Sequence, residues 1–302
     1  MSTDILSPKC SPFGADELHR RLAAFNARRF APSLPSENWS GEIVSACDDA
    51  IVEGDFLESE RLRAMPRAKT APCSASGFIA WFEALSEDGP GQNDPLFPWL
   101  AREATLDQMK WFLTQEIAGE AGFEDLTALT QVRFPARPKL ELARNYWDEM
   151  GRGAQKGMHG PLLETLAKRL ELCPRIDSTV WESLALANTM AGLASNRRYA
   201  YHSIGALGAI EMTAPARAEA VAAGLKRLGV SSGDRHYFDL HSILDVKHSL
   251  AWNAEVIQPL VAQTPHVAQA IAEGALMRLE CGRRCFERYR RELALTAVAR
   301  AA

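Results

Sequence analysis

Apolar residues recur along most of the chain with the three-to-four-residue spacing of a helix that buries one face. No alternating run of β-branched residues is long enough to indicate a strand. Proline and glycine separate the apolar stretches from one another. The helices predicted in this way span residues 15–30, 42–63, 76–85, 106–126, 139–150, 160–172, 178–195, 199–212, 214–228, 235–260 and 265–295. The pattern therefore predicts an all-α fold with the short connections that are typical of helix bundles.

Several of these boundaries depend on single residues. Thr105 followed by Gln108 is a capping-box sequence, in which two side chains bind the free amides at the start of a helix, so a helix is expected to begin there. Gly54 is expected to interrupt the second helix, and Pro66 to end it. Pro215 is expected to separate the two helices on either side of it, because proline cannot donate a helical hydrogen bond.

Residues 1–75 differ from the rest because they mix short helical patterns with proline, serine and polar connectors. We expect them to form an N-terminal extension with short helices, followed by one helical domain over residues 76–302. The 302 residues are 47% hydrophobic and 24% charged, which is an ordinary globular composition with enough apolar material for one large core or two modest ones. No internal repeat divides the chain further.

Charge and cysteine content exclude several classes of protein. The net charge of −4 gives no electrostatic reason to expect nucleic-acid binding. Arginines cluster only near the C-terminus, where interleaved glutamates predict a solvated helix with ion pairs. No apolar run reaches about 18 residues and no signal peptide is recognisable, so we expect a cytoplasmic protein without membrane contact. The six cysteines lack C-x-x-C spacing and are expected to be free thiols. Cys281 and Cys285 stand one helical turn apart and are expected to be buried, the alternative being that they share a metal.

The stretch from His241 to His248 carries the clearest candidate chemistry. His241, Asp245 and His248 stand at relative positions 0, 4 and 7, which lie within roughly 60° of one another at about 100° per helical residue. A helix would therefore present two imidazoles and a carboxylate on one face. These groups suit iron, manganese or zinc. The alternative is a histidine-rich face that is exposed to water.

Glu149 and His159 form a second candidate, because they flank a segment with three glycines that disfavour a continuous helix by about 0.5–1 kcal/mol each. On an unbroken helix the two side chains would diverge, since ten residues fall roughly 80° short of three turns. A break at the glycines would let them meet, and such irregularities are common at functional sites. The alternative is an ordinary helix end with Gly151 or Gly153 beyond the last turn.

Other carboxylates lie on separate predicted helices. Glu211 follows a run of small uncharged residues, where it is either buried with a partner or at a helix end facing water, and the nearby Pro215 favours the helix end. Glu116 and Glu120 stand one turn apart among apolar residues, so one of them is expected to face the core. Carboxylates and histidines on facing helices of one bundle are what a dinuclear iron site uses.

The order and spacing of these residues resemble the heme-oxygenase-like diiron oxidases and oxygenases, also described as iron-containing redox enzymes. The resemblance rests on NYWDEMGRG around Glu149, on His159, on Glu211 and on YFxxHxxxDxxH from residue 237, and it covers roughly residues 100–260. It implies a seven-helix heme-oxygenase-like bundle, here with an extra N-terminal helical segment. It also implies two Fe²⁺ ions held by Glu120, Glu149, His159, Glu211, His241, Asp245 and His248. Glu124 and Glu116 are the alternatives to Glu120.

The resemblance further implies an O₂-dependent non-heme diiron oxidase or oxygenase with a role in biosynthesis. Similar enzymes perform N-oxygenation, desaturation or oxidative C–C cleavage on small amino-acid-derived or fatty-acid-like substrates. An anionic substrate group would find arginine, which binds carboxylates in a bidentate manner, just upstream of Glu211. The residues expected to bind substrate there are Arg197, Arg198, Tyr201 and His202. The alternative for the arginine pair is simple exposure to solvent.

Two other classes of function compete with this prediction. A heme oxygenase, or a cofactor-free protein of the same fold, would use one histidine and leave the carboxylates unexplained. An iron-storage protein or a helical scaffold would hold metal without a substrate cavity. The expected partners are a small-molecule substrate and O₂, while the sequence leaves open an external electron donor and a homodimer.

Overall fold

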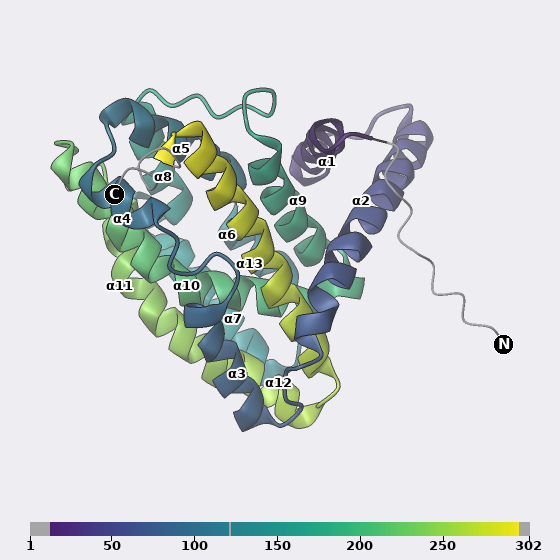
Figure 1. Cartoon of the computed structure of the whole chain (residues 1–302). Coiled ribbons are helices and arrows are strands. Elements are labelled where there is room, and N and C mark those ends of the chain that lie inside the picture. The colour runs from purple at the N-terminus through teal and green to yellow at the C-terminus, as the bar shows by residue number, and fades with distance from the viewer. Residues whose placement is uncertain (1–12, 121, 296–302) are drawn as a thin grey trace.

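The computed structural model describes residues 13–120 and 122–295, apart from the side chains of residues 119 and 120. Every regular element in this part of the chain is a helix (Figure 1), so the predicted all-α fold is confirmed. The helices are α1 (Ala15–Phe30), α2 (Trp39–Ala68), α3 (Ala75–Asp88), α4 (Leu96–Arg102), α5 (Leu106–Glu120), α6 (Phe123–Thr130), α7 (Ala136–Glu149), α8 (His159–Arg169), α9 (Trp181–Ser195), α10 (Ala200–Arg227), α11 (His236–Ala251), α12 (Gln258–Gln263) and α13 (Val267–Glu292). Three 3₁₀ turns and one π-helical segment connect some of them, namely η1 (Gly151–Gly153), η2 (Gln155–Gly157), η3 (Arg197–Tyr199) and η4 (Trp252–Ile257).

Helix α10 is the centre of the bundle. It packs along α11 and α13 and also contacts α3, α4, α6 and α9. Two glycines bring α10 and α13 into backbone contact: a Cβ at Gly205 would lie 1.8 Å from the Ile271 carbonyl oxygen, and a Cβ at Gly274 would lie 1.9 Å from the His202 carbonyl oxygen. Figure 1 shows α13 crossing the middle of the molecule. Apolar side chains from these helices form one continuous core.

Helices α1 and α2 lie together on one side of the bundle (Figure 1), where α1 packs on α9 and α2 packs on α13. The ring of His19 on α1 stacks on Trp181 with 5.6 Å between centroids, and Asn26 donates a 2.8 Å hydrogen bond to Asn188 Oδ1. With 30 residues, α2 is longer than the short helices predicted for this region. The division of the chain at residue 75 stays a prediction.

Three predicted breaks are wrong. Gly54 lies within α2, and Pro66 lies in its last turn rather than beyond its end. Pro215 lies inside α10, which continues from Ala200 to Arg227. A proline inside a helix costs about 3 kcal/mol, and the burial of α10 against the helices around it offsets that cost.

In residues 106–126 the sequence pattern predicted one continuous helix, and the structure has a break there. Gly122 adopts a left-handed conformation, with φ of +89°, and divides this stretch into α5 and α6. The predicted start of α5 is confirmed, because Thr105 N donates to Gln108 Oε1 (2.9 Å) and Gln108 N donates to Thr105 Oγ1 (3.3 Å).

Among the described residues, no helix has both the length and the apolarity needed to cross a bilayer.

The cysteines of the described residues are free thiols, as predicted. Cys281 and Cys285 are fully buried on α13, which also agrees with the sequence pattern. Cys10 lies outside the described residues.

Candidate metal centre

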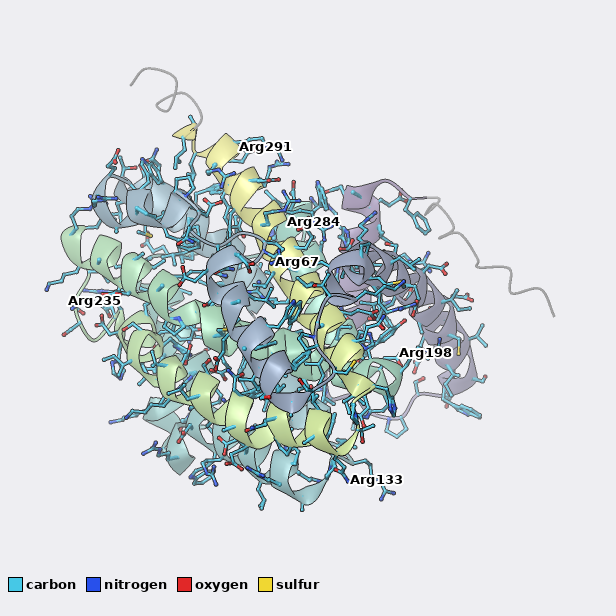
Figure 2. All side chains as sticks on the ribbon, turned by 60° about the horizontal axis from the view of Figure 1, so that its bottom comes forward. Arg67, Arg133, Arg198, Arg235, Arg284 and Arg291 are labelled. Carbon is cyan, nitrogen blue, oxygen red and sulfur yellow. The ribbon has the colours of Figure 1, made fainter. Side chains whose placement is uncertain are left out.

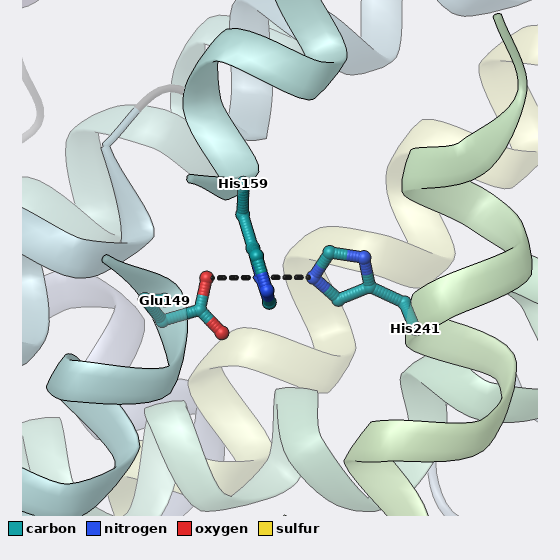
Figure 3. Close-up of side chains that lie close together, drawn as sticks. All are labelled: Glu149, His159 and His241. Atoms are coloured by element: carbon teal, nitrogen blue, oxygen red, sulfur yellow. Dashed lines mark hydrogen bonds and ion pairs between the residues drawn. The ribbon is translucent and has the colours of Figure 1, made fainter. Parts of the chain in front are cut away.

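Glu149, His159 and His241 point toward one another from α7, α8 and α11 (Figure 3). His159 Nδ1 lies 2.6 Å from Glu149 Oε2 and 3.0 Å from His241 Nε2. Glu149 and His159 are buried, and His241 is half-buried. One donor atom from each side chain lies within 4.8 Å of the other two, so the three side chains have the spacing needed to bind one metal ion. We call these residues the first donor group.

The break between α7 and α8 creates this first donor group. Helix α7 ends at Glu149, and the chain makes two 3₁₀ turns before α8 begins at His159. Gly151 has a φ of +59°, and a Cβ there would lie 2.3 Å from the Gly157 carbonyl carbon. Only glycine fits this conformation and this close contact. The loop is thus the break at the glycines that the sequence suggested, and it brings the carboxylate and the imidazole together.

Glu211, Asp245 and His248 form a second donor group between α10 and α11. His248 Nδ1 lies 3.4 Å from Glu211 Oε2 and 3.9 Å from Asp245 Oδ1. All three side chains are buried. The prediction that Pro215 favours a water-facing helix end for Glu211 is wrong, because α10 continues through the proline and leaves Glu211 only 2% exposed.

Neighbouring polar groups orient the donors. His241 Nδ1 lies 2.7 Å from the Tyr237 carbonyl oxygen, which leaves its Nε2 facing the first donor group. His248 Nε2 lies 3.2 Å from Asp148, which leaves its Nδ1 facing the second. Such partners fix the tautomer and direction of metal-binding histidines. Asn145 donates a 2.6 Å hydrogen bond to Glu211. Sequence reasoning assigned no role to these partners, although Asn145 and Asp148 belong to the NYWDE stretch that carried the resemblance.

Burial and the crowding of carboxylates shift the pKa values of the donors. Burial lowers the pKa of His159 and that of His241 to about 4, so both imidazoles are neutral, as metal ligands must be. Burial and the nearby Glu211 carboxylate raise the pKa of Glu149 well above its usual range. Although burial opposes its charge, the Glu211 carboxylate raises the pKa of His248 to about 9, so His248 is protonated in the metal-free protein and a bound cation would replace that proton. Divalent cations would compensate these crowded carboxylates, and imidazoles with carboxylates suit iron.

The structure describes two of the three candidates for a seventh donor. The side chain of Glu120 lies outside the described residues. The carboxylate of Glu124 lies beside the start of α8, where a Cβ at Gly160 would be 3.1 Å from Glu124 Oε1. Glu116 instead accepts a hydrogen bond from Tyr289 on α13. Of the two described candidates, Glu124 is therefore the one beside the first donor group.

A cavity of about 470 Å³ adjoins both donor groups. Its lining includes Glu149, His159 and His241 of the first group and Glu211 and Asp245 of the second. Cavity-lining residues recur along α10 over three turns, or about 16 Å, and apolar side chains line much of the remaining wall. The donors therefore border a space that is large enough for a small organic molecule.

The four residues predicted to bind substrate do not line this cavity. Arg197 Nη1 donates a 3.1 Å hydrogen bond to the Thr130 carbonyl oxygen. Arg198 is exposed, on the side of the molecule where α2 lies (Figure 2). Tyr201 packs edge-on against an aromatic ring, and His202 Nε2 lies 3.0 Å from a buried glutamate, Glu273. Arg197, Tyr201 and His202 therefore hold neighbouring segments together, and Arg198 faces solvent.

The arginines that do line the cavity are Arg217 on α10 and Arg278 on α13. Sequence reasoning assigned Arg278 to a solvated C-terminal helix, which is wrong because Arg278 is only 6% exposed. The prediction holds for Arg283, which pairs with Glu280 and Glu287 on the same helix. The apolar residues on both sides of Arg278 in the sequence are the signal from which the burial of this part of α13 could have been predicted.

An all-α bundle with two buried groups of carboxylates and imidazoles beside one cavity has the architecture of a dinuclear metal site. A family model described as "iron-containing redox enzyme" matches residues 110–283. The chain belongs to this family, the heme-oxygenase-like diiron oxidases, as the sequence motifs indicated. Both donor groups lie within the matched residues. No curated protein matches the chain.

Proposed function

We propose that this protein is an O₂-dependent non-heme diiron oxidase or oxygenase that acts on a small amino-acid-derived or fatty-acid-like molecule. The observation that carries the proposal is that both donor groups adjoin a single cavity. A storage protein or a scaffold would need the donors but would have no use for a cavity of substrate size beside them. A protein that uses one histidine would leave the second donor group without a role.

The side chains that would hold two ferrous ions are Glu149, His159, Glu211, His241, Asp245 and His248, together with one further glutamate. The sequence favours Glu120 for that place, and Glu124 is the described alternative whose carboxylate lies beside the first donor group. When bound, the irons supply the electrons that reduce O₂. The reaction is N-oxygenation, desaturation or oxidative C–C cleavage, and an external electron donor restores the ferrous state.

The surrounding residues prepare the centre for this chemistry. The Tyr237 carbonyl group and Asp148 hold His241 and His248 in the tautomers that face the donor groups. Asn145 holds the Glu211 carboxylate in position. The apolar cavity wall excludes water from the reacting atoms of a bound substrate and keeps them next to both groups.

Oxygen uptake by the iron-loaded protein tests this proposal. The full chain would be loaded with Fe²⁺ under anaerobic conditions, its iron content measured, and O₂ consumption followed with and without candidate carboxylates and amino acids. We expect two irons per chain and O₂ consumption that a substrate accelerates, with an oxidised product detected by mass spectrometry. Oxidation of iron that no substrate influences would instead support storage, and an inert protein that retains only zinc would support a scaffold.

A further inference from the structure

Every exposed charged side chain between residues 132 and 156 is basic. This stretch contains α7 and the loop that leads to α8. The exposed basic residues are Arg133, Arg137, Lys139, Arg144, Arg152 and Lys156. Of the acidic residues, Glu141 and Glu149 are buried and Asp148 is half-buried. A chain with a net charge of −4 therefore has a locally positive surface here.

Ion pairs within this surface leave its outer side positive. Three of the arginines pair with acidic residues, and in each pair the acidic side chain is the less exposed of the two. The pairs are Arg137 with Glu255, Arg144 with Glu141 and Arg152 with Asp148. Lys139 and Lys156 form no ion pair with any described residue. A partner that approaches this surface would therefore meet cations first.

Helix α11 extends the positive surface with apolar side chains. Helix α7 packs against η4, which continues α11, and Asp148 of α7 contacts His248 of α11. The exposed apolar residues of the two helices are Leu140, Trp147, Ile243, Val246 and Leu250. Among residues 240–254 the exposed charged side chain is again basic, Lys247. We call the exposed residues of α7, of the loop to α8 and of α11 the α7–α11 face.

The composition of the α7–α11 face suits protein docking. Exposed apolar and aromatic side chains with charged residues around them are characteristic of interaction surfaces. Their basic charge favours an acidic partner, because complementary charge accelerates encounter and opposes the binding of wrong partners.

The α7–α11 face lies directly outside the donor groups. Asp245 and His248 are on the buried side of α11, so a single helix, about 10 Å across, separates them from the exposed side. A shorter path runs through the loop: Arg152 Nε donates a 2.6 Å hydrogen bond to Asp148, which lies 3.2 Å from His248 Nε2. Two polar contacts thus connect an exposed guanidinium to a metal-binding histidine.

We propose that the α7–α11 face binds an acidic protein that carries single electrons, and that this protein returns the iron to the ferrous state. The inference rests on the proposed function and identifies its redox partner. Two reduced carriers bind in turn and each loses one electron, which balances the reduction of two ferric ions to two ferrous ions. Complexes between redox proteins have small and transient interfaces, which a patch on two neighbouring helices can provide.

Calorimetric titration of the full chain with plant-type ferredoxin, an acidic iron–sulfur protein, tests the docking step. We expect binding that weakens at least about fivefold between about 50 and 300 mM NaCl, because salt screens the attraction between charges. The double variant Lys139→Glu with Lys247→Glu should bind at least about tenfold more weakly. The control, Lys69→Glu with Lys226→Glu, makes the same charge change at exposed lysines outside the face and should stay within about twofold of the wild type.

A second pair of variants tests the apolar part of the face. Ile243→Ser should weaken ferredoxin binding at least about threefold, because it removes an apolar contact. Ile51→Ser on α2 is the matched control, since the two isoleucines are similarly exposed, at 68% and 64%. It should bind ferredoxin like the wild type.

Anaerobic stopped-flow reduction of the oxidised, iron-loaded protein tests the electron transfer. At limiting reduced ferredoxin, the double lysine variant should be reduced at least about tenfold more slowly than the wild type. Dithionite, a small reductant that needs no docking face, should reduce both proteins at the same rate. This comparison distinguishes a lost docking surface from a damaged metal centre.

Ferredoxin binding that the double lysine variant retains would overturn the inference, as would the absence of binding both by ferredoxin and by flavodoxin, an acidic flavin carrier. A wild-type dimer in solution that Ile243→Ser dissociates would also overturn it, because a second copy would then cover the face. The calorimetry is repeated with metal-free protein. Docking and reduction that yield no oxidised substrate, or docking to a chain that fails to bind iron, would count against the proposed function alone.

Discussion

Asp245 gives the second donor group a negative charge that an amide of the same shape lacks. The variant Asp245→Asn should therefore retain the fold but bind the second iron at least about tenfold more weakly, leaving close to one iron per chain where the wild type holds two. Anaerobic titration with Fe²⁺ and elemental analysis would measure this change. Asp239→Asn, on the same helix, is the control, because Asp239 pairs with Arg235 outside the donor groups. Two tightly bound irons in Asp245→Asn would show that the carboxylate is not a ligand.

His19 should make the stability of the protein depend on pH. Burial and the charge of Arg284 lower the pKa of His19 to about 4, from an ordinary value of 6.5. Protonation therefore favours the unfolded chain: the stabilisation is complete above about pH 6.5 and is lost as the pH falls toward 4. Between about pH 7 and pH 5, the metal-free wild type should lose about 2 kcal/mol more of its free energy of unfolding than His19→Gln loses.

Urea unfolding of both proteins at the two pH values checks this prediction. His159 and His241 also have lowered pKa values, but they are present in both proteins, so the difference between the two losses reports on His19 alone. Equal losses would mean that the His19 ring is hydrated in solution.

At the scale of helices, the connection between α7 and α8 determines whether the first donor group forms. Because Gly151 has a positive φ and touches the backbone of Gly157, Gly151→Ala should destabilise the protein by about 1–3 kcal/mol and reduce iron binding by the first group. Gly54→Ala is a matched control inside α2, where a Cβ would contact nothing within 4 Å. It should stabilise the protein by about 0.5–1 kcal/mol and leave iron binding unchanged.

Chemical unfolding and iron analysis of the two glycine variants test this prediction together. A fully metal-loaded Gly151→Ala with wild-type stability would show that the loop tolerates another conformation. A loss of iron in Gly54→Ala would show that the assay responds to stability changes far from the centre.

At the scale of the whole molecule, the donors come from α7, α8, α10 and α11 and meet only when the chain is folded. Metal that binds only the folded state stabilises it by about 2.7 kcal/mol at a hundredfold excess over its dissociation constant. The iron-loaded protein should therefore melt at a higher temperature than the metal-free protein in anaerobic scanning calorimetry. Asp245→Asn should show a smaller increase, and an unchanged melting temperature in the wild type would argue against a site formed by folding.

The sequence by itself determined the features that depend on neighbouring residues. Helical periodicity predicted the all-α fold, and the spacing of His241, Asp245 and His248 placed three donors on one helix, because both follow from the geometry of a single helical turn. The glycines around Gly151 indicated a break, since a backbone conformation is a local property. The Thr105 capping box was equally recognisable.

Only the tertiary structure decided the features that depend on contacts between distant segments. Pro215 lies inside α10 and Glu211 is buried, because packing against the surrounding helices outweighs the local preference of proline. The position of the Glu124 carboxylate beside α8 depends on how α6 meets α8. Arg278 borders the cavity and Arg197 does not. Which side of a helix faces the cavity depends on the helices packed against it, and the spacing of residues within one helix does not determine that packing.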